Sequence, residues 1–324
     1  MMSKRIIFIL LIILQLIPVS YAQEYDYIVS KEGNGDFSTV QEAINATPDF
    51  RKKATRILIK KGIYKEKIII AGSKQLIQLI GEPNQQVVLT YDDFAQKKNS
   101  FGEEIGTSGS SSILIYGDGF YAQNITFENS SGPVGQAVAA WIAADKAIFQ
   151  NCIFLGFQDT LYTYGKGARQ LYVNCHIEGT VDFIFGSSTV WFEKCILLCK
   201  NSGYITAAST PIDVKNGYLF NQCLIIGDRS TGKFYLGRPW RPHAKVIFQH
   251  TTLPDFIDEG GWDNWRNIEN EKTAYFAEYG NKGPGSHVEK RVHWSHQLTH
   301  SEAEKYQINT YFDDWDPSDI IKNP

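Results

Sequence analysis

The chain has 324 residues, of which 43% are hydrophobic and 13% aromatic, enough for one large hydrophobic core or for two ordinary domains. Its formal net charge is −3 at pH 7, so it lacks the long-range positive field that would attract a polyanion. The sequence also has no basic run interleaved with aromatics, which argues against nucleic acid as a partner.

The first 22 residues are typical of a secretory signal peptide. Lys4 and Arg5 precede an apolar run over 6–19, and small residues lead to a cleavage site after Ala22. The run holds 14 residues, whereas a membrane-spanning helix needs about 20. We therefore expect 1–22 to be removed, 23–324 to form one domain without a membrane span, and the protein to be secreted or periplasmic. An uncleaved anchor is the alternative.

Residues 38–46 are predicted to form a short helix. Residues 38–41 read as a capping box, and Val40, Ala43 and Ile44 form an apolar stripe. Such a helix suits the open N-terminal end of a repetitive fold. A weaker helical pattern from Leu298 to Tyr306 predicts a helical tail that covers the side or the other end.

Similar short strings recur along the middle of the chain, at steps of 27, 23, 20 and 28 residues. Periods of this size mark solenoids. Each string alternates like a strand, and no helical pattern lies between the strings. The expected fold is all-β, a single-stranded right-handed parallel β-helix whose equivalent residues stack about 4.8 Å apart. The strings are centred on Ile125, Cys152, Cys175, Cys195 and Cys223.

The sequence contains five cysteines, so at least one has no partner within the chain. Cys152, Cys175, Cys195 and Cys223 share the register of the repeat, and we expect them to pack inward as small hydrophobic side chains and to remain mostly reduced. Cys199 falls outside this register, and we expect it to react first with a thiol reagent. No Cys-x-x-Cys pair signals a zinc or redox site.

Several familiar kinds of site find no support. His293, His296 and His300 share a helical face, but no carboxylate is placed to complete a metal site. The string 33–35, Gly-Asn-Gly, is more simply a turn than part of a nucleotide fingerprint. There is no Gly-x-Ser-x-Gly elbow. We therefore expect neither a metal nor a cofactor.

Polar residues one repeat apart form the strongest candidate site. Gln136 and Gln158 are separated by 22 residues, and Asp159 and Asp182 by 23, so in a β-helix each pair would stack. Two carboxylates about 5 Å apart raise the pKa of one of them strongly and titrate as a unit. That is the starting state for a nucleophile beside a general acid. The glutamine amides could donate to an oxyanion.

Arg238 is the candidate to keep one carboxylate charged. It lies in the string 236–240, where Gly237 allows close approach, Pro239 adds rigidity and Trp240 offers a flat surface for a sugar. Each motif alone has a structural interpretation, because a buried aspartate commonly stabilises a turn and stacked glutamines often form a ladder. The shared register favours a catalytic site.

At these residues the sequence resembles the pectin methylesterase family. The matching strings are residues 33–37, 62–66, 136–138, 156–162, 179–186, 236–240, 277–279 and 283–285. The resemblance covers nearly all of the chain after the signal peptide. It implies a monomeric enzyme that hydrolyses the methyl esters of pectin, a polygalacturonate, to pectate and methanol through an aspartyl acyl-enzyme, without a cofactor.

The resemblance also implies a role for each candidate residue. Asp182 matches the nucleophile, and Asp159 the general acid and then base. Gln136 and Gln158 match the residues that stabilise the anionic intermediate. Arg238 matches the residue that bonds the nucleophile and helps to bind the substrate.

Three further residues are expected to contact the substrate: Thr107, Phe183 and Trp240. The string around Thr107 is a looser match than the others. Ala140 stands where many members have leucine, a small packing change beside Gln136. Trp262 and Trp265 lie where aromatic residues of a cleft would be useful, but they could equally anchor a loop.

Three alternatives remain open on the sequence. One is a lyase or glycosidase of the same fold acting on the same polymer, although a pectate lyase would need a calcium-binding acidic cluster. Another is a protein of this fold that only binds carbohydrate, which should have lost one of the aspartates. The third is an esterase or thioesterase with another acyl substrate.

Overall fold

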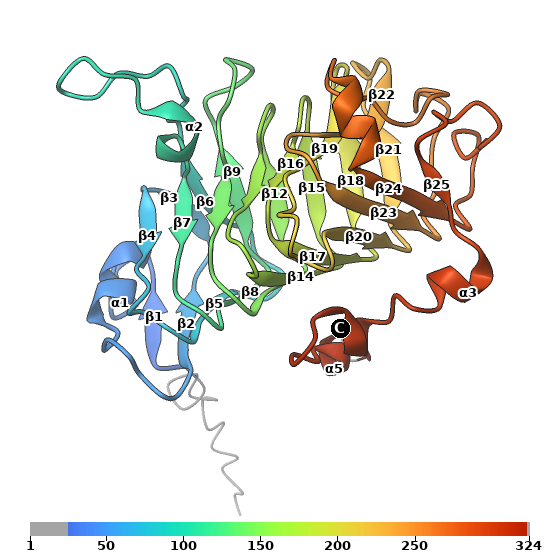
Figure 1. Ribbon diagram of the computed structural model, residues 1–324. Coiled ribbons are helices and arrows are strands. Elements are labelled where there is room, and N and C mark those ends of the chain that lie inside the picture. Colours follow the sequence, from blue (N-terminus) through green and yellow to red (C-terminus); the bar gives the residue numbers. More distant parts are fainter. Residues whose placement is uncertain (1–24, 323–324) are drawn as a thin grey trace, which may run out of the picture.

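The computed structural model describes residues 25–322, so the predicted signal peptide lies outside the described residues. Short strands follow one another around a single axis and form three sheets (Figure 1). Neighbouring strands within each sheet run parallel. The chain visits the first, second and third sheets in turn, so three strands make one coil. The structure is the expected all-β, right-handed parallel β-helix.

Within residues 25–322, the sheets contain 11, seven and seven strands. The first sheet is formed by β1 (Tyr27–Val29), β2 (Thr55–Ile59), β5 (Ile77–Gly81), β8 (Tyr121–Gln123), β11 (Ala147–Gln150), β14 (Arg169–Val173), β17 (Thr189–Glu193), β20 (Tyr218–Asn221), β23 (Lys245–Gln249), β24 (Tyr275–Tyr279) and β25 (His296–Gln297). The second sheet is formed by β3 (Gly62–Lys65), β6 (Val87–Tyr91), β9 (Thr126–Asn129), β12 (Ile153–Leu155), β15 (His176–Gly179), β18 (Ile196–Cys199) and β21 (Leu224–Gly227). The third sheet is formed by β4 (Ile68–Ile70), β7 (Ile113–Ile115), β10 (Ala140–Ile142), β13 (Leu161–Thr163), β16 (Ile184–Gly186), β19 (Gly203–Ala208) and β22 (Phe234–Pro239).

The interior of the coil is filled by residues stacked in register. One ladder is aromatic, with ring centroids between 4.3 and 4.9 Å apart, and consists of Phe149, Tyr172, Phe192, Phe220 and Phe248. A second ladder is the predicted one of Ile125 and four cysteines, all at most 2% exposed. The residue before each has φ between 52° and 58°, a left-handed corner that asparagine tolerates better than most residues. The repeated strings are thus one corner of the coil.

Cys199 departs from the prediction. It is fully buried at the end of β18, where it pairs with Gly179 and Gly227 of the adjacent coils. Burial raises the pKa of this thiol well above its usual value, so it has neither the exposure nor the thiolate character of a reactive cysteine. All five cysteines are free and buried.

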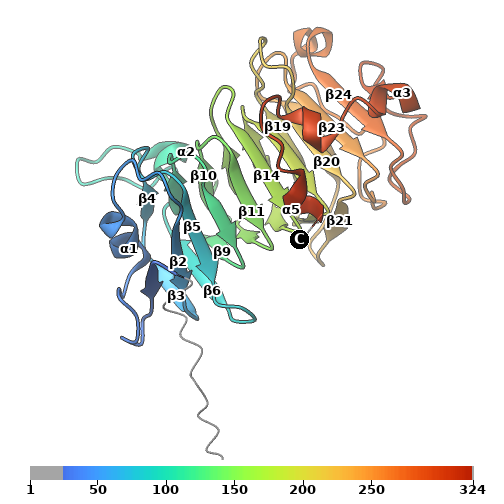
Figure 2. The same ribbon diagram turned by 90° about the horizontal axis from the view of Figure 1, so that it is seen from below.

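A short helix, α1 (Val40–Ala46), covers the N-terminal end of the coil (Figure 2). Val40, Ala43 and Ile44 are buried, as the apolar stripe predicted. The capping box, however, consists of Thr39 and Glu42 rather than residues 38 and 41, and the helix begins at Val40, two residues after the predicted start at residue 38. The reason is that the Gln41 side chain bonds to the backbone of Ile69 instead, whereas the Glu42 carboxylate accepts from the Thr39 amide and completes the box.

The C-terminal segment covers the side of the β-helix rather than its end (Figure 1). The predicted helix over 298–306 shortens to α3 (His300–Ala303), followed by α4 (Ile308–Tyr311) and α5 (Ser318–Lys322). Tyr311 and Phe312 pack on the outer face of the first sheet against Trp191 and Leu219. The Tyr311 hydroxyl also donates to the carbonyl of Gly217 at 3.1 Å. Tertiary packing therefore holds this segment, rather than helical propensity.

Two further short elements are α2 (Gly106–Gly109) and the 3-10 helix η2 (Ile268–Lys272).

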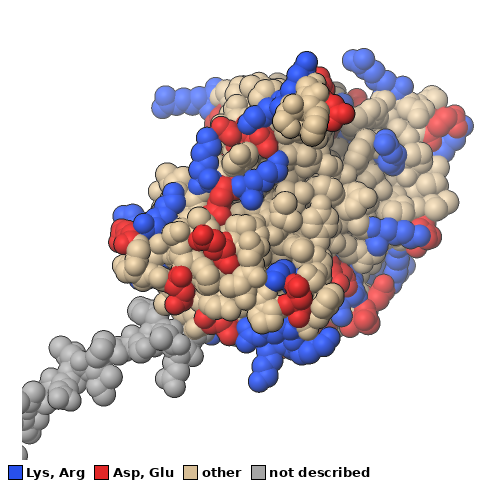
Figure 3. All heavy atoms as spheres, turned by 90° about the vertical axis from the view of Figure 1, so that its left-hand side faces the viewer, with Lys and Arg blue, Asp and Glu red and all other residues tan. Residues whose placement is uncertain are grey.

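On the end of the molecule that carries α1, acidic and basic side chains are interspersed (Figure 3). In the part of the chain that the structure describes, no helix is long and apolar enough to span a membrane.

Candidate active site

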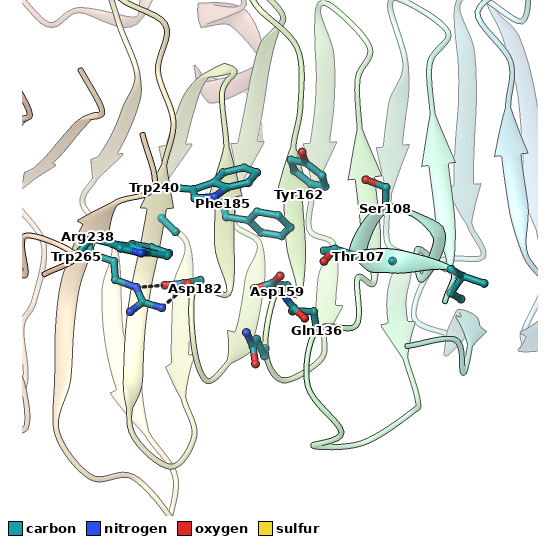
Figure 4. A pocket seen from close by; sticks show the side chains of 14 residues that line it. Thr107, Ser108, Gln136, Asp159, Tyr162, Asp182, Phe185, Arg238, Trp240 and Trp265 are labelled. Atoms are coloured by element: carbon teal, nitrogen blue, oxygen red, sulfur yellow. Dashed lines mark hydrogen bonds and ion pairs between the residues drawn. The ribbon is translucent and has the colours of Figure 1, made fainter. Parts of the chain in front are cut away.

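A cleft of about 500 Å³ lies along the outer face of the third sheet, where the strands begin (Figure 4). It runs from α2 at one end to β22 at the other. The residues that line it are Ile105, Gly106, Thr107, Ser108, Gln136, Gln158, Asp159, Tyr162, Asp182, Phe185, Ala207, Arg238, Trp240 and Trp265. All five catalytic candidates from the sequence are among them.

Asp159 and Asp182 occupy the same corner of two adjacent coils. The pairing of Leu161 with Ile184 puts the aspartates in register, and the Asp159 amide donates to the carbonyl of Val181 at 3.1 Å. Both have left-handed φ, 66° and 53°, which Asp adopts more readily than most residues. Their side chains face the cleft although the residues are only 7% and 6% exposed. The predicted stacking is confirmed.

Arg238 forms two parallel hydrogen bonds with Asp182. Its Nε donates to Oδ1 at 2.9 Å and its Nη2 to Oδ2 at 2.7 Å. The preceding Gly237 lets β22 lie close to β19, because a Cβ there would lie 2.0 Å from the Thr206 Oγ1. A bidentate guanidinium contact favours the ionised form of a carboxylate and fixes its orientation.

The two carboxyl groups have different surroundings. Burial, and then the charge of Asp182, raise the pKa of Asp159 well above its usual value. Burial also raises the pKa of Asp182, but the hydrogen bonds and charge of Arg238 oppose this effect. Within the described residues, no side chain donates a hydrogen bond to the Asp159 carboxyl. These surroundings favour the proton on Asp159 and the charge on Asp182.

The two glutamines lie beside the aspartates, also in adjacent coils. Gln136 and Gln158 form a parallel bridge, and the amide of Ala137 donates to the carbonyl of Gln158 at 3.1 Å. Both side chains line the cleft and are partly exposed. Their amide groups can thus donate to an oxygen bound between them and the aspartates.

Aromatic rings form the floor and one wall of the cleft. Tyr162 and Phe185 stack with ring centroids 4.2 Å apart, and Trp240 meets each of them edge-on. Trp265 lines the cleft at the far end, whereas Trp262 is 1% exposed and belongs to the interior. Of these two tryptophans, one is therefore a cleft residue and the other an anchor.

Phe183 does not line the cleft, so the expectation that it contacts the substrate is wrong. Its side chain is fully buried and packs edge-on against Phe234 in the interior. The corner at Asp182 sends both Phe183 and Ile184 inward, and Phe185 is the first residue after it to face the cleft. Tyr162 and Phe185 were missed, although both follow their aspartates at the same spacing of three residues, a signal that the sequence contains.

Thr107 and Ser108 close the other end of the cleft from α2. This helix is held in place because the Gly106 amide donates to Ala95, and the Ala95 amide donates to the carbonyl of Gln136, both at 2.9 Å. Thr107 therefore lines the cleft, and its contact with the substrate stays a prediction.

Comparison with known proteins assigns the family. Residues 26–314 match the Pectinesterase family. The chain belongs to this family. Its enzyme class is therefore that of the carboxylic ester hydrolases.

Relatives of known family align with most of this chain. The chain is 41% identical over 291 residues to "Pectinesterase 31" from Arabidopsis thaliana, and the alignment covers 88% of this chain and 91% of the relative. It covers only 41% to 53% of the length of relatives named pectinesterase/pectinesterase inhibitor.

Solved structures of pectin methylesterases are similar to this chain. "Pectin methylesterase from Carrot" matches with a TM-score of 0.83 and 30% identity, over 89% of this chain and 93% of that one. A pectin methylesterase in complex with a hexasaccharide matches with a TM-score of 0.79 and 30% identity, over 90% and 98%.

Proposed function

We propose that Asp182 and Asp159 carry the hydrolysis of pectin methyl esters, to pectate and methanol, in this member of the pectinesterase family. The observation that carries the proposal is the asymmetry of the pair. Asp182 is charged and aligned by two guanidinium hydrogen bonds, whereas Asp159 is buried beside it without a hydrogen-bond donor from the described side chains. One carboxylate is thereby ready to attack and the other carboxyl is ready to donate a proton.

The first half of the reaction forms an acyl-enzyme. An oxygen of ionised Asp182 attacks the C6 carbonyl carbon of a methyl galacturonate, and the electron pair of the carbonyl moves to its oxygen. The side-chain amides of Gln136 and Gln158 donate hydrogen bonds to that oxyanion. When the carbonyl re-forms, the bond to the methoxy oxygen breaks, and Asp159 gives that oxygen its proton, so methanol leaves.

The second half restores the pair. Asp159, now ionised, removes a proton from a water molecule as the water oxygen attacks the same carbonyl carbon. The bond to Asp182 then breaks, and Asp182 leaves as a carboxylate that Arg238 stabilises. The product is a galacturonic acid unit, Asp159 is protonated again and Asp182 is charged again. No further reactant is required.

The aromatic part of the cleft provides the surfaces that bind a sugar polymer in this site. Trp240 and Trp265 provide flat apolar surfaces against which pyranose rings pack, and the stacked rings of Tyr162 and Phe185 line the cleft beside them. Thr107 adds a polar contact at the opposite end. An uncharged methyl ester also enters a buried carboxylate pair at lower electrostatic cost than a galacturonate anion.

Release of methanol from methyl-esterified polygalacturonate tests the proposal. We expect the wild-type enzyme to release it, and Asp182→Asn to lose activity by about 10²-fold or more. A folded Asp182→Asn enzyme that retained most of its turnover would overturn the assignment of the nucleophile. The family match does not favour a purely carbohydrate-binding protein or an esterase for another acyl group.

We further propose that residues 1–22 are removed on export, and that the enzyme acts outside the cytoplasm as a monomer. A polymer substrate of cell walls is met there, and the apolar run of 14 residues suits a cleaved signal. Sequencing the N-terminus of the exported protein checks the cleavage after Ala22, and light scattering checks the mass of the particle. A mature protein that still begins before residue 22 contradicts the first expectation, and a dimer mass contradicts the second.

A further inference from the structure

The guanidinium group of Arg238 lies between two aromatic rings. Its Cζ is 3.9 Å from the ring centroid of Tyr204 and 3.7 Å from that of Trp265. Trp265 lines the cleft, but Tyr204 is not among its lining residues. Tyr204 lies in β19 beside Asp182, because Ile184 of β16 pairs with Thr206 of β19. The ring of Tyr204 is thus the next member of the ladder that contains the two aspartates.

Arg238 lies two coils from its carboxylate, so its side chain has to cross the strand between them. It lies on β22 and pairs with Ala207 of β19, which in turn pairs with Phe185 of β16. The small side chain of Ala207 leaves room for the arginine to cross β19 toward the corner at Asp182. An arginine chain of that length loses much rotational freedom when it is held in one geometry. The contact with Asp182 alone fixes only the end of the chain.

We propose that Tyr204 is a positioning residue for the reaction: the face of its ring holds the Arg238 guanidinium in the plane that meets both oxygens of Asp182. This inference rests on the proposed roles of Asp182 and Arg238. The contact is made by the ring face, so the hydroxyl is not required. Burial raises the pKa of Tyr204, so the ring stays uncharged while the enzyme works.

Loss of the Tyr204 ring should loosen Arg238 and thereby raise the pKa of Asp182. The charged and titratable groups that face Asp182 are Asp159, Arg238 and Asp263, together with the Tyr204 hydroxyl. Arg238 alone among them is a cation. A loosened guanidinium therefore leaves burial and Asp263 to raise the pKa of Asp182 further. Fewer molecules then carry an ionised nucleophile at acid pH, and the acid limb of the kcat profile moves to higher pH.

The test compares three single variants. Tyr204→Leu removes the ring, and Tyr204→Phe keeps the ring but removes the hydroxyl. Tyr235→Leu is the matched control, because Tyr235 stacks on the far side of Tyr204 at 5.3 Å, one coil farther along the same face. We expect Tyr204→Leu to lose roughly 2- to 30-fold in kcat, as the range of cation–π energies implies, and its acid limb to move upward. Tyr204→Phe should restore both properties, and Tyr235→Leu should keep the acid limb of the wild-type enzyme.

A double-mutant cycle distinguishes an effect that acts through Arg238 from a general disturbance of the structure. In an Arg238→Lys background, which lacks the planar guanidinium, Tyr204→Leu should cost little more. If Tyr204→Leu fails to fold, Tyr204→Met takes its place in every comparison. The inference is overturned if the ring-less variant keeps the wild-type kcat and acid limb, or if Tyr204→Phe is equally impaired. Asp182→Asn in the same assay separates this result from failure of the proposed function, since an active Asp182→Asn enzyme removes the basis of both.

Discussion

Replacing Asp159 by asparagine should separate the two halves of the proposed chemistry. The general acid contributes only when the leaving group needs a proton, and such a contribution is typically about 10²–10⁴ in rate, or about 2.7 to 5.4 kcal/mol of barrier. Methanol release by Asp159→Asn should fall by this amount. An aryl ester, whose phenolate leaves without a proton, should recover the first burst of product. Asp182→Asn should show no burst on either ester.

The structure also predicts that Asp159→Asn is well folded. Its φ of 66° suits asparagine at least as well as aspartate. Because the pKa of Asp159 is raised on folding, its contribution to stability is present below the unfolded pKa of about 4 and is lost as the pH rises through the folded value. The neutral amide avoids that loss, so Asp159→Asn should melt above the wild-type enzyme at neutral pH, and the gain should vanish in acid. Thermal melts at several pH values measure this gain.

Two results would refute this assignment. One is a folded Asp159→Asn enzyme that releases methanol at the wild-type rate. The other is an aryl-ester burst that survives in Asp182→Asn and disappears in Asp159→Asn, since that pattern exchanges the two roles. A lower melting temperature at pH 7 would instead contradict a raised pKa of Asp159 in the folded enzyme.

Three further outcomes are expected. In a plot of kcat against pH, measured by methanol release, activity should fall in acid as Asp182 is protonated and in alkali as Asp159 ionises, because the pKa values of both are raised. Activity that stays flat across the acid range would contradict this expectation. All five cysteines, including Cys199, should react with a thiol reagent only after denaturation, because each is at most 2% exposed; rapid labelling of the native enzyme would show that a coil opens. Exhaustive chelation should leave activity unchanged, since within the described residues no group of three or more His, Cys, Asp or Glu side chains could hold a metal ion; a loss that calcium restores would overturn this expectation.

The candidate site could be predicted because a β-helix turns sequence spacing into contact. Residues one coil apart must stack, so the steps from Gln136 to Gln158 and from Asp159 to Asp182 were sufficient to place both pairs side by side. The bidentate contact of Arg238 needed the family resemblance as well, because a reach of two coils leaves no regular spacing in the sequence.

Other features depend on geometry that a strand pattern does not encode. The left-handed corner at Asp182 sends two consecutive residues inward, which buries Phe183 and turns Phe185 toward the cleft. Trp262 and Trp265 differ because the chain between them turns out of the coil, where Trp265 itself has a φ of 61°. The tail has little helical propensity of its own, and its path follows the apolar outer face of the first sheet, which it buries.

The corner that aligns the aspartates also explains their chemistry. The left-handed residues just before β13 and β16, Asp159 and Asp182, direct their side chains toward the cleft, and one coil separates the two. This spacing brings the two carboxyl groups so close that the charge of one disfavours ionisation of the other. Which one is charged then depends on a residue two coils away, Arg238, and on the rings of Tyr204 and Trp265 that enclose it. The repeat supplies the pair, and the irregular contacts around Arg238 make its two members different.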